Sequence, residues 1–345
     1  HRVDHTERFT YPMEERLLLE SSPHLKDSDS IGRIMWSVVV ALAPAVAISL
    51  YFFGLRALQM YVVSIAFAEA AELFCLKLRG KPLQQAIDGS AAVTGLLVAM
   101  ILPASASWFC VAVASVFAIA IVKHCFGGLG HNIWNPALAA RVFVQFAYPA
   151  QVSLSSWTTP RPLLGNMSIA DAQTQATPLF RESPINPDYM DLFLGNGISG
   201  CVGETCKLAL LIGGIYLIAR KRVDWRIPLF YIGTVFVLTM LLPAPAGNAP
   251  AWINDPFYHV LSGGLFLGAF FMATDMVTTP LTANGRTIFA IGCGVLVAII
   301  RFYGGYPEGV AYSIIIMNTA VPLIDRWCRP SVYGSKTPKP TERKI

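Results

Sequence analysis

The sequence predicts an all-α integral membrane protein with about ten transmembrane helices. Only 14% of its 345 residues are charged and 54% are hydrophobic, whereas a soluble protein of this size carries about 25% charged residues. The apolar residues form long blocks; residues 34–53, for example, contain no charge and can cross about 30 Å of hydrocarbon as a helix. Because such blocks recur along the whole chain, we expect one membrane domain.

Ten apolar spans are predicted, and several are too short for a complete crossing. The run 91–102 stops at Pro103, and the run 136–148 contains Arg141. Short segments of this kind predict broken or re-entrant helices, which are tolerated at membrane depth where protein or a cavity covers the freed backbone. The predicted spans are 34–53, 58–76, 89–102, 108–123, 136–148, 204–219, 227–242, 257–274, 287–302 and 309–325.

The distribution of Lys and Arg predicts that both termini are cytoplasmic. With that orientation, 20 of the 26 basic residues lie inside and only four, Arg56, Arg161, Arg181 and Arg301, lie outside, as the positive-inside rule requires. The inside set includes Lys123 and the loop 220–226. Both ends on one side demand an even number of crossings, and ten fits best.

These spans divide the chain into five parts. Residues 1–33 form a cytoplasmic arm, 34–148 a first five-span repeat, 149–203 an extracytoplasmic loop, 204–325 a second repeat and 326–345 a basic cytoplasmic tail. The repeat is suggested by Phe126-Gly-Gly and Tyr303-Gly-Gly, each of which precedes the last span of its half. Since five spans is an odd number, the second copy would be inverted, an arrangement that places small-molecule or ion sites near the midplane.

The seven cysteines show no metal-binding spacing, and no metal site is predicted. They stand at 75, 110, 125, 201, 206, 293 and 328, mostly within apolar runs. Buried cysteines that act as small apolar side chains account for this pattern. A disulfide or an iron–sulfur ligand is the alternative.

Carboxylates within or beside the spans are candidates for ion handling. Glu69 and Glu72 are three residues apart on one helix face, and Asp275 and Asp88 stand at span ends. A carboxylate inside the bilayer is costly and often functional, although Glu69 and Glu72 could also lie near the cytoplasmic interface. We expect Glu204 to cap a helix.

Arg141 stands within a short apolar span. A guanidinium there needs a buried partner, and we favour a structural ion pair over a contact with a flavin.

The long polar loop contains the segment Asp171-Ala-Gln-Thr174-Gln-Ala176-Thr177-Pro178. By itself such a segment is typical of a turn. It lies, however, among several other ordered motifs: Asp88-Gly-Ser-Ala-Ala-Val-Thr94-Gly, Gly-Gly-Leu-Gly-His-Asn132-Ile-Trp-Asn135-Pro, Gly203-Glu-Thr, Asp224-Trp-Arg-Ile-Pro and Met272-Ala-Thr-Asp-Met-Val-Thr-Thr-Pro.

With these motifs, residues 30–330 resemble the NqrB/RnfD family, whose members belong to the Rnf complex and to the sodium-translocating NADH:quinone oxidoreductase. The short N-terminal arm favours the Rnf type. The resemblance implies FMN joined through its phosphate to a threonine within the pattern Asp-x-x-Ser/Thr-Gly-Ala-Thr/Ser. Asp171, Thr174, Ala176 and Thr177 match this pattern, which makes Thr177 the implied attachment site; Gln175 replaces the usual glycine.

The resemblance also implies a non-covalent riboflavin among the spans. Candidate contacts are Asn132 and Asn135, with Asp88 and Thr94 as further candidates. Their side chains could hydrogen-bond the edge of the ring. The alternative is structural, because Asn-Pro commonly begins a helix.

Taken together, the sequence favours an electron-carrying membrane component of a ferredoxin:NAD⁺ oxidoreductase that translocates Na⁺ or H⁺ across the bacterial inner membrane. Its implied partners are the A, B, C, E and G components of the Rnf complex, a flavin transferase during maturation and membrane lipid, with no role for nucleic acid. A flavin-free secondary transporter and a passive scaffold for redox partners are the alternatives. The transporter would explain the inverted repeat but leaves the 171–177 loop without a role.

Overall fold

The protein is described by a computed structural model that covers residues 29–152, 179, 188–243, 251–304 and 308–329. All elements discussed below belong to one unit, Ile31–Ile345. The first group of elements comprises α1 (Ile31–Phe53), α2 (Leu55–Leu78), η1 (Leu83–Asp88), α3 (Ser90–Met100), α4 (Trp108–Val116), η2 (Phe117–His124), α5 (Pro136–Ala147) and α6 (Pro149–Val152).

The second group of elements follows the polar loop. It comprises α7 (Tyr189–Leu194), α8 (Lys207–Ala219), α9 (Arg226–Leu241), η5 (Ala251–Asn254), α10 (Pro256–Leu261), α11 (Leu265–Leu267), η6 (Gly268–Met272), α12 (Ala283–Tyr303) and α13 (Val310–Trp327). Within the described residues the regular structure is helical, apart from one isolated bridge between Pro103 and Cys201. The all-α prediction is therefore confirmed.

The apolar spans correspond to helices of unequal length. Among the described helices, α1 and α12 are long and apolar enough to cross a membrane, whereas α3, α4 with η2, α5, α8 and α9 are shorter apolar helices. The predicted short helices at 91–102 and 136–148 are present as α3 and α5. The number of crossings and the inverted repeat stay predictions.

Local sequence signals explain several helix starts. Asn135 caps α5 and Pro136 occupies its first turn; Asp255 and Pro256 begin α10 in the same way. Each cap side chain accepts hydrogen bonds from backbone N–H groups that have no partner inside the helix, and proline at the first position loses no hydrogen bond.

The predicted span 257–274 is interrupted. The helix α10 ends at Leu261, and Ser262, Gly263 and Gly264 separate it from α11, which runs directly into the π-helical turn η6. The side chain of Arg301 donates to the carbonyl oxygens of His259 (2.5 Å) and Ser262 (3.2 Å) at this break. A basic side chain from α12 thus satisfies carbonyl groups that the end of α10 leaves free.

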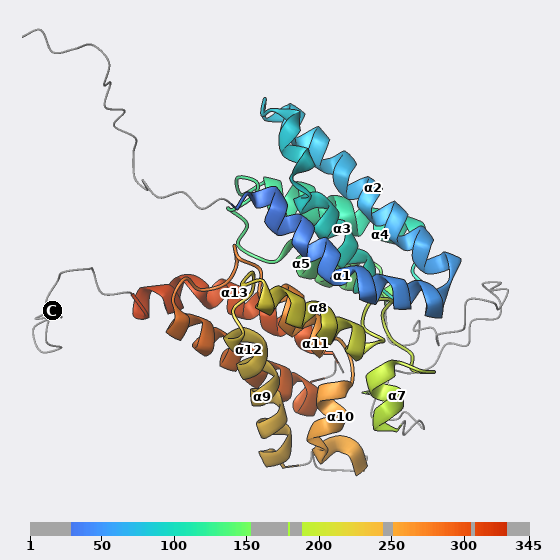
Figure 1. The fold of residues 1–345 in the computed structure, drawn as a ribbon, viewed down its shortest axis with the longest axis vertical. Coiled ribbons are helices and arrows are strands. Elements are labelled where there is room, and N and C mark those ends of the chain that lie inside the picture. Colours follow the sequence, from blue (N-terminus) through green and yellow to red (C-terminus); the bar gives the residue numbers. More distant parts are fainter. Residues whose placement is uncertain (1–28, 153–178, 180–187, 244–250, 305–307, 330–345) are drawn as a thin grey trace, which may run out of the picture. The chain divides into compact units, whose positions relative to one another are not determined.

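The two groups of helices pack in a similar order. In the first, α2 contacts α3 and α4; in the second, α9 contacts α10 and α12. The helices α1 and α8 join the groups, as do α5 and α13 (Figure 1). At the α1–α8 contact Gly213 lies directly against the carbonyl oxygen of Ala41, so that the two backbones approach as closely as small residues allow in membrane helices.

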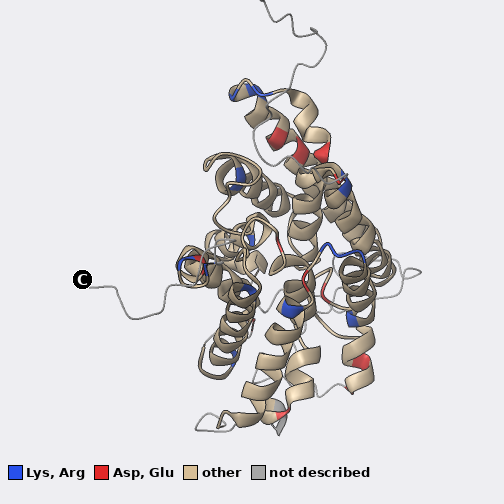
Figure 2. Cartoon of the chain, turned by 60° about the vertical axis from the view of Figure 1, so that its left-hand side comes forward, with Lys and Arg blue, Asp and Glu red and all other residues tan. Residues whose placement is uncertain are grey.

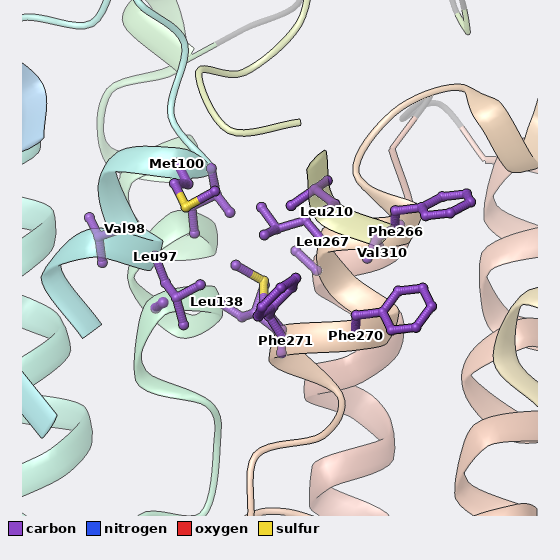
Figure 3. Close-up of a cluster of buried hydrophobic side chains, with 14 of the residues drawn as sticks. Leu97, Val98, Met100, Leu138, Leu210, Phe266, Leu267, Phe270, Phe271 and Val310 are labelled. Atoms are coloured by element: carbon purple, nitrogen blue, oxygen red, sulfur yellow. The ribbon is translucent and has the colours of Figure 1, made fainter. Parts of the chain in front are cut away.

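The main hydrophobic core lies where the short helices meet. Figure 3 shows its centre, where Leu97, Met100 and Leu138 of the first group lie opposite Leu210, Leu267 and Phe271 of the second. The labelled residues come from α3 (Leu97, Val98, Met100), α5 (Leu138), α8 (Leu210), α11 and η6 (Phe266, Leu267, Phe270, Phe271) and α13 (Val310).

Charged residues are sparse on the helices (Figure 2). Lys123 and Arg301, which the sequence assigned to opposite sides of the membrane, are only 2% and 5% exposed. Both are engaged inside the protein, Lys123 in an ion pair with Glu72 and Arg301 with backbone carbonyls. Their positions therefore carry less weight in the positive-inside count than residues in exposed loops.

Candidate functional site: a polar-ended pocket and two buried charge networks

A partly open pocket with a cavity volume of about 100 Å³ lies between the two groups of helices. Like small-molecule and cofactor sites, it has mostly apolar walls and a few convergent polar groups. Its apolar walls come from α1, α3, α8 and η6, through Met35, Val38, Leu97, Leu217 and Phe271, and its polar groups include Ser90, Thr94, Lys123, Asn132, Asn135 and Asp275. Three of the four predicted riboflavin candidates and one ion candidate therefore line the same pocket.

Asn135 is held in place by contacts that connect both groups. Its Oδ1 accepts from the backbone N–H groups of Ala137 (3.1 Å) and Leu138 (3.3 Å), and its Nδ2 donates to the carbonyl oxygen of Met272 at the end of η6 (3.2 Å). Its own backbone N–H donates to the side-chain oxygen of Asn318 (3.2 Å). These bonds are those expected of a helix cap, so the structural role of Asn135 is established by its geometry.

Asn132 has fewer structural bonds. Its Nδ2 donates to the carbonyl oxygen of Trp134 (3.2 Å), and its side chain also contacts the Asp275 carboxyl group. Both residues line the pocket, where Asn132 is buried and Asp275 is half-buried. Of the two asparagines, Asn132 is thus the better placed to turn an amide toward a bound molecule.

A chain of polar contacts extends from the pocket along α2 and η2. The Nζ of Lys123 lies 2.7 Å from Glu72 Oε2 and donates to Ser90 Oγ at 2.8 Å. Ser90 Oγ donates in turn to Asp88 Oδ1 at 2.6 Å, and His124 Nε2 lies 3.0 Å from the same Glu72 oxygen. Glu72 is therefore a partnered carboxylate of a buried network and not an isolated buried charge.

The network links two sets of predicted residues. Asp88, a riboflavin candidate, does not line the pocket but fixes Ser90, which does. Thr94 lines the pocket and donates to the Ser90 carbonyl oxygen at 3.0 Å. Glu69, one turn before Glu72 on α2, is half-buried and has a less enclosed position.

Sequence reasoning did not single out Ser90, Lys123 or His124. Lys123 and His124 stand at the end of an apolar span, where a basic residue is usually counted as a loop residue. The one signal in the sequence for this ion pair was that Glu72 lies in one predicted span and Lys123 at the end of another. Nothing in the sequence paired those two spans.

A second buried network surrounds Arg141 on α5. Its Nη2 lies 2.5 Å from Glu308 Oε2, and its Nη1 lies 3.7 Å from Glu204 Oε1 and donates to Cys201 Sγ at 3.2 Å. Arg141 also donates to the carbonyl oxygen of Ile101, just after α3. The preferred ion-pair interpretation of Arg141 agrees with this geometry.

The prediction that Glu204 caps a helix is wrong. Glu204 precedes α8 without capping it, because that helix begins after Cys206 and has no side-chain cap.

The predicted flavin-attachment segment, with Asp171, Thr174, Ala176 and Thr177, lies outside the described residues. Leu179 is described and is buried in a small cluster with Leu192, Ile198, Ile253, Tyr258 and Phe302. The cysteines at 75, 110, 201, 206 and 293 are buried thiols and those at 125 and 328 are more accessible; all seven are free.

Comparison with known proteins shows the family to which the chain belongs. Residues 18–334 match the model of the NQR2, RnfD, RnfE family, and the chain belongs to this family. It is 45% identical over 326 residues, 93% of this chain and 96% of its relative, to the D subunit of the Na⁺-translocating ferredoxin:NAD⁺ oxidoreductase complex of Acetobacterium woodii.

Two further relatives are similar over comparable lengths. The chain is 42% identical to the D subunit of the proton-translocating ferredoxin:NAD⁺ oxidoreductase complex of Clostridium ljungdahlii, over 92% of this chain and 96% of the relative. It is 40% identical to the D subunit of the ion-translocating oxidoreductase complex of Stutzerimonas stutzeri, over 88% of this chain and 92% of the relative. The relatives thus include members of both a Na⁺-translocating and a proton-translocating complex.

Proposed function

We propose that this chain is the D-type membrane subunit of an ion-translocating ferredoxin:NAD⁺ oxidoreductase, the Rnf complex. The observation that carries this proposal is the similarity to the D subunits of such complexes over almost the full length of both chains. As a member of that complex it would act with the A, B, C, E and G components in the bacterial inner membrane. We further propose ten crossings in two inverted repeats, with both termini cytoplasmic.

Two flavins are proposed as its cofactors: FMN bound covalently to Thr177, and riboflavin bound in the pocket between the helix groups. The lining of the pocket supports this proposal, since its walls are apolar and its polar groups include Asn132, Thr94 and Asp275. A flavin supplies the one- and two-electron chemistry that amino-acid side chains lack. Asn132 would hydrogen-bond the ring edge, while Asn135 and Ser90 hold the surrounding backbone and side chains in place.

Ion handling is proposed for Glu72, Glu69 and Asp275. Glu72 is tied to Lys123 and His124, so its charge is balanced inside the protein. Glu69 lies on the same helix, and Asp275 lies at the opposite group of helices against the pocket. Asp275 lines the pocket and Glu72 is paired with Lys123, which also lines it, so a change of charge in the pocket would alter the affinity for a cation nearby.

The test of the proposed function is the covalent flavin. Only a hydroxyl group can form the phosphoester, and the segment 171–177 offers Thr174 and Thr177. The variant Thr177→Val keeps the side-chain shape but removes the hydroxyl, so it should abolish flavin fluorescence of the chain on a denaturing gel. Thr174→Val should weaken labelling without moving it, because Thr174 and Asp171 would serve recognition by the flavin transferase.

Mass spectrometry of peptide 162–181 provides the decisive measurement. FMN on Thr177 is expected after coexpression with the transferase. FMN on Thr174, or a peptide without flavin mass, would contradict the assignment. Absorbance of the purified native chain separates the proposal from its alternatives, since a flavin-free secondary transporter or a passive scaffold would be colourless.

A further inference from the structure

Two buried carboxyl groups, those of Glu204 and Glu308, face each other beside the break between α10 and α11. Glu204 is 5% exposed and the Glu308 side chain 11% exposed, and their ligand oxygens lie within 4.8 Å of each other. The adjacent glycines permit this approach: a side chain at Gly264 would collide with Glu204 Oε1, and one at Gly263 would press on Glu308 Oε1. Three segments of the second helix group therefore converge on one acid pair, and Arg141 on α5 reaches it from the first group.

One oxygen of each carboxyl group has no hydrogen-bond partner among the described residues. Arg141 forms an ion pair with Glu308 Oε2 and lies 3.7 Å from Glu204 Oε1. The other two oxygens, Glu204 Oε2 and Glu308 Oε1, are buried and unpartnered. Two unpartnered acceptors of like charge in a buried site are strongly unfavourable. A single hydrogen on one carboxyl group, donated to the other, would remove both defects.

A metal ion does not fit the pair as well. Cys201 Sγ, with the two carboxylates, forms the only group of metal-ligating atoms of this kind within the described residues. Arg141, however, donates to Cys201 and to Glu308, so a positive charge already occupies the place of a cation. Two further basic groups lie near the site: Lys207 at the start of α8 and Arg301 on α12.

Those basic groups are themselves committed to backbone oxygens. Lys207 donates to the carbonyl of Thr205 at 3.3 Å, and Arg301 donates to those of His259 and Ser262. Among the described residues, neither donates to Glu204 Oε2 or Glu308 Oε1. Arg141 already takes the space that a metal ion would need, whereas a proton needs no such space and supplies the hydrogen-bond donor that Glu204 Oε2 and Glu308 Oε1 lack.

We propose that Glu204 and Glu308 form a proton-binding site in which one proton, carried by Glu204 and donated to Glu308, is held between the helix groups. The site lies at a helix break, where discontinuous helices of membrane proteins commonly bind ions. It is distinct from the flavin pocket and from Glu72, and it does not depend on the flavin assignments. In a coupled complex it would take up or release a proton when the α10–α11 break or the start of α8 moves.

Infrared spectroscopy of the purified complex tests the proposal directly. The wild-type minus Glu204→Gln difference spectrum should contain the carbonyl band of one protonated carboxylic acid, shifted in D₂O. The matched control Asp191→Asn, which alters a carboxylate on α7 outside the cluster, should give no such band. Absence of the acid band in the wild-type minus Glu204→Gln spectrum would overturn the proposal. So would a band abolished by Na⁺ but not by K⁺ at constant pH, since that result assigns a sodium site.

Thermal unfolding gives an independent readout. The Gln side chain of Glu204→Gln can donate its amide hydrogen to Glu308 as the acid would, so its midpoint should equal that of the wild type. Arg141→Met leaves Glu308 buried without its cation and should lower the midpoint. If Glu204→Gln destabilises the protein as much as Arg141→Met, Glu204 is an ionised partner of Arg141 and the proton site does not exist.

Discussion

At the scale of single residues, Asn132 and Asn135 of the pocket have different structural roles. Asn135 uses both side-chain heavy atoms in bonds within the protein, whereas Asn132 makes one short-range bond and faces Asp275. The sequence identified both residues from one motif but could not separate the helix cap from the ligand contact. That separation depends on Met272, which is 137 residues away from Asn135.

This difference gives a prediction for the riboflavin site. Replacing both asparagines with Leu should lower the extractable riboflavin while the covalent FMN remains. Of the single variants, Asn132→Leu should account for the loss of riboflavin with little change in stability. Asn135→Leu should lower the free energy of unfolding by about 0.5–2 kcal/mol, as expected for a lost cap. Riboflavin equal to the wild-type level in assembled Asn132→Leu complex would refute the contact.

The buried pair Glu72–Lys123 makes a second prediction at this scale. Glu72→Gln or Lys123→Met leaves a buried charge without its partner and should destabilise the protein by about 3–5 kcal/mol. The double variant Glu72→Leu with Lys123→Leu should recover much of that loss, because no charge remains buried. Apparent unfolding midpoints in detergent measure the effect; a double variant as unstable as the sum of the single ones would show that the two side chains do not interact.

At the scale of elements, the contact between α1 and α8 depends on the absence of a side chain. Gly213 lies against the backbone of α1, and Gly214 beside it lies against the ring of Phe270. Gly213→Ala should therefore force α1 and α8 apart, at about 1–3 kcal/mol for overpacking. Its matched control is Gly233→Ala on α9, where a side chain would meet nothing within 4 Å.

The control should be neutral or stabilising by about 1 kcal/mol, since alanine favours a helix over glycine. Unfolding midpoints of the two variants are the measurement. Equal behaviour of Gly213→Ala and Gly233→Ala would mean that α1 and α8 do not pack as closely as described.

Element positions could be predicted well where the cause is local. Hydropathy located the short helices α3 and α5, and Asn135-Pro136 marked the start of α5. The break after Leu261 was not predicted, because the hydropathy of the run 257–274 was interpreted as one span, although Ser262, Gly263 and Gly264 offered a local signal for an interruption. Its carbonyl groups are satisfied by Arg301, about 40 residues away, and sequence periodicity contains no information about such a partner.

At the scale of the whole molecule, topology is the open prediction. Most Lys and Arg fall on one side if both termini are cytoplasmic. In a background without native cysteines, Asn166→Cys should react with an impermeant thiol reagent in intact cells, and Lys336→Cys should react only after permeabilisation. Protection at position 166 together with labelling at 336 in intact cells would reverse the orientation.

The same scale shows why the sites were only partly predictable. The family resemblance indicated Asn132, Asn135 and Thr94 in one cofactor site, and the fold places these three around one pocket. The resemblance did not reveal the ion pairs Lys123–Glu72 and Arg141–Glu308, because their members are 51 and 167 residues apart in the sequence. Buried charges are matched by tertiary packing, and a count of charges along the chain treats them as independent.

The Asn135 cap also has a consequence for hydrogen exchange. One side chain bonds the first turn of α5 to the last carbonyl of η6, and the adjacent backbone bonds to Asn318 on α13. An opening motion at this point must break bonds in both helix groups at once, so the amide protons of Asn135, Ala137 and Leu138 should exchange as a single cooperative unit. The end of the pocket nearest α5 would then open in one cooperative step between two states, whereas a fraying helix end opens gradually.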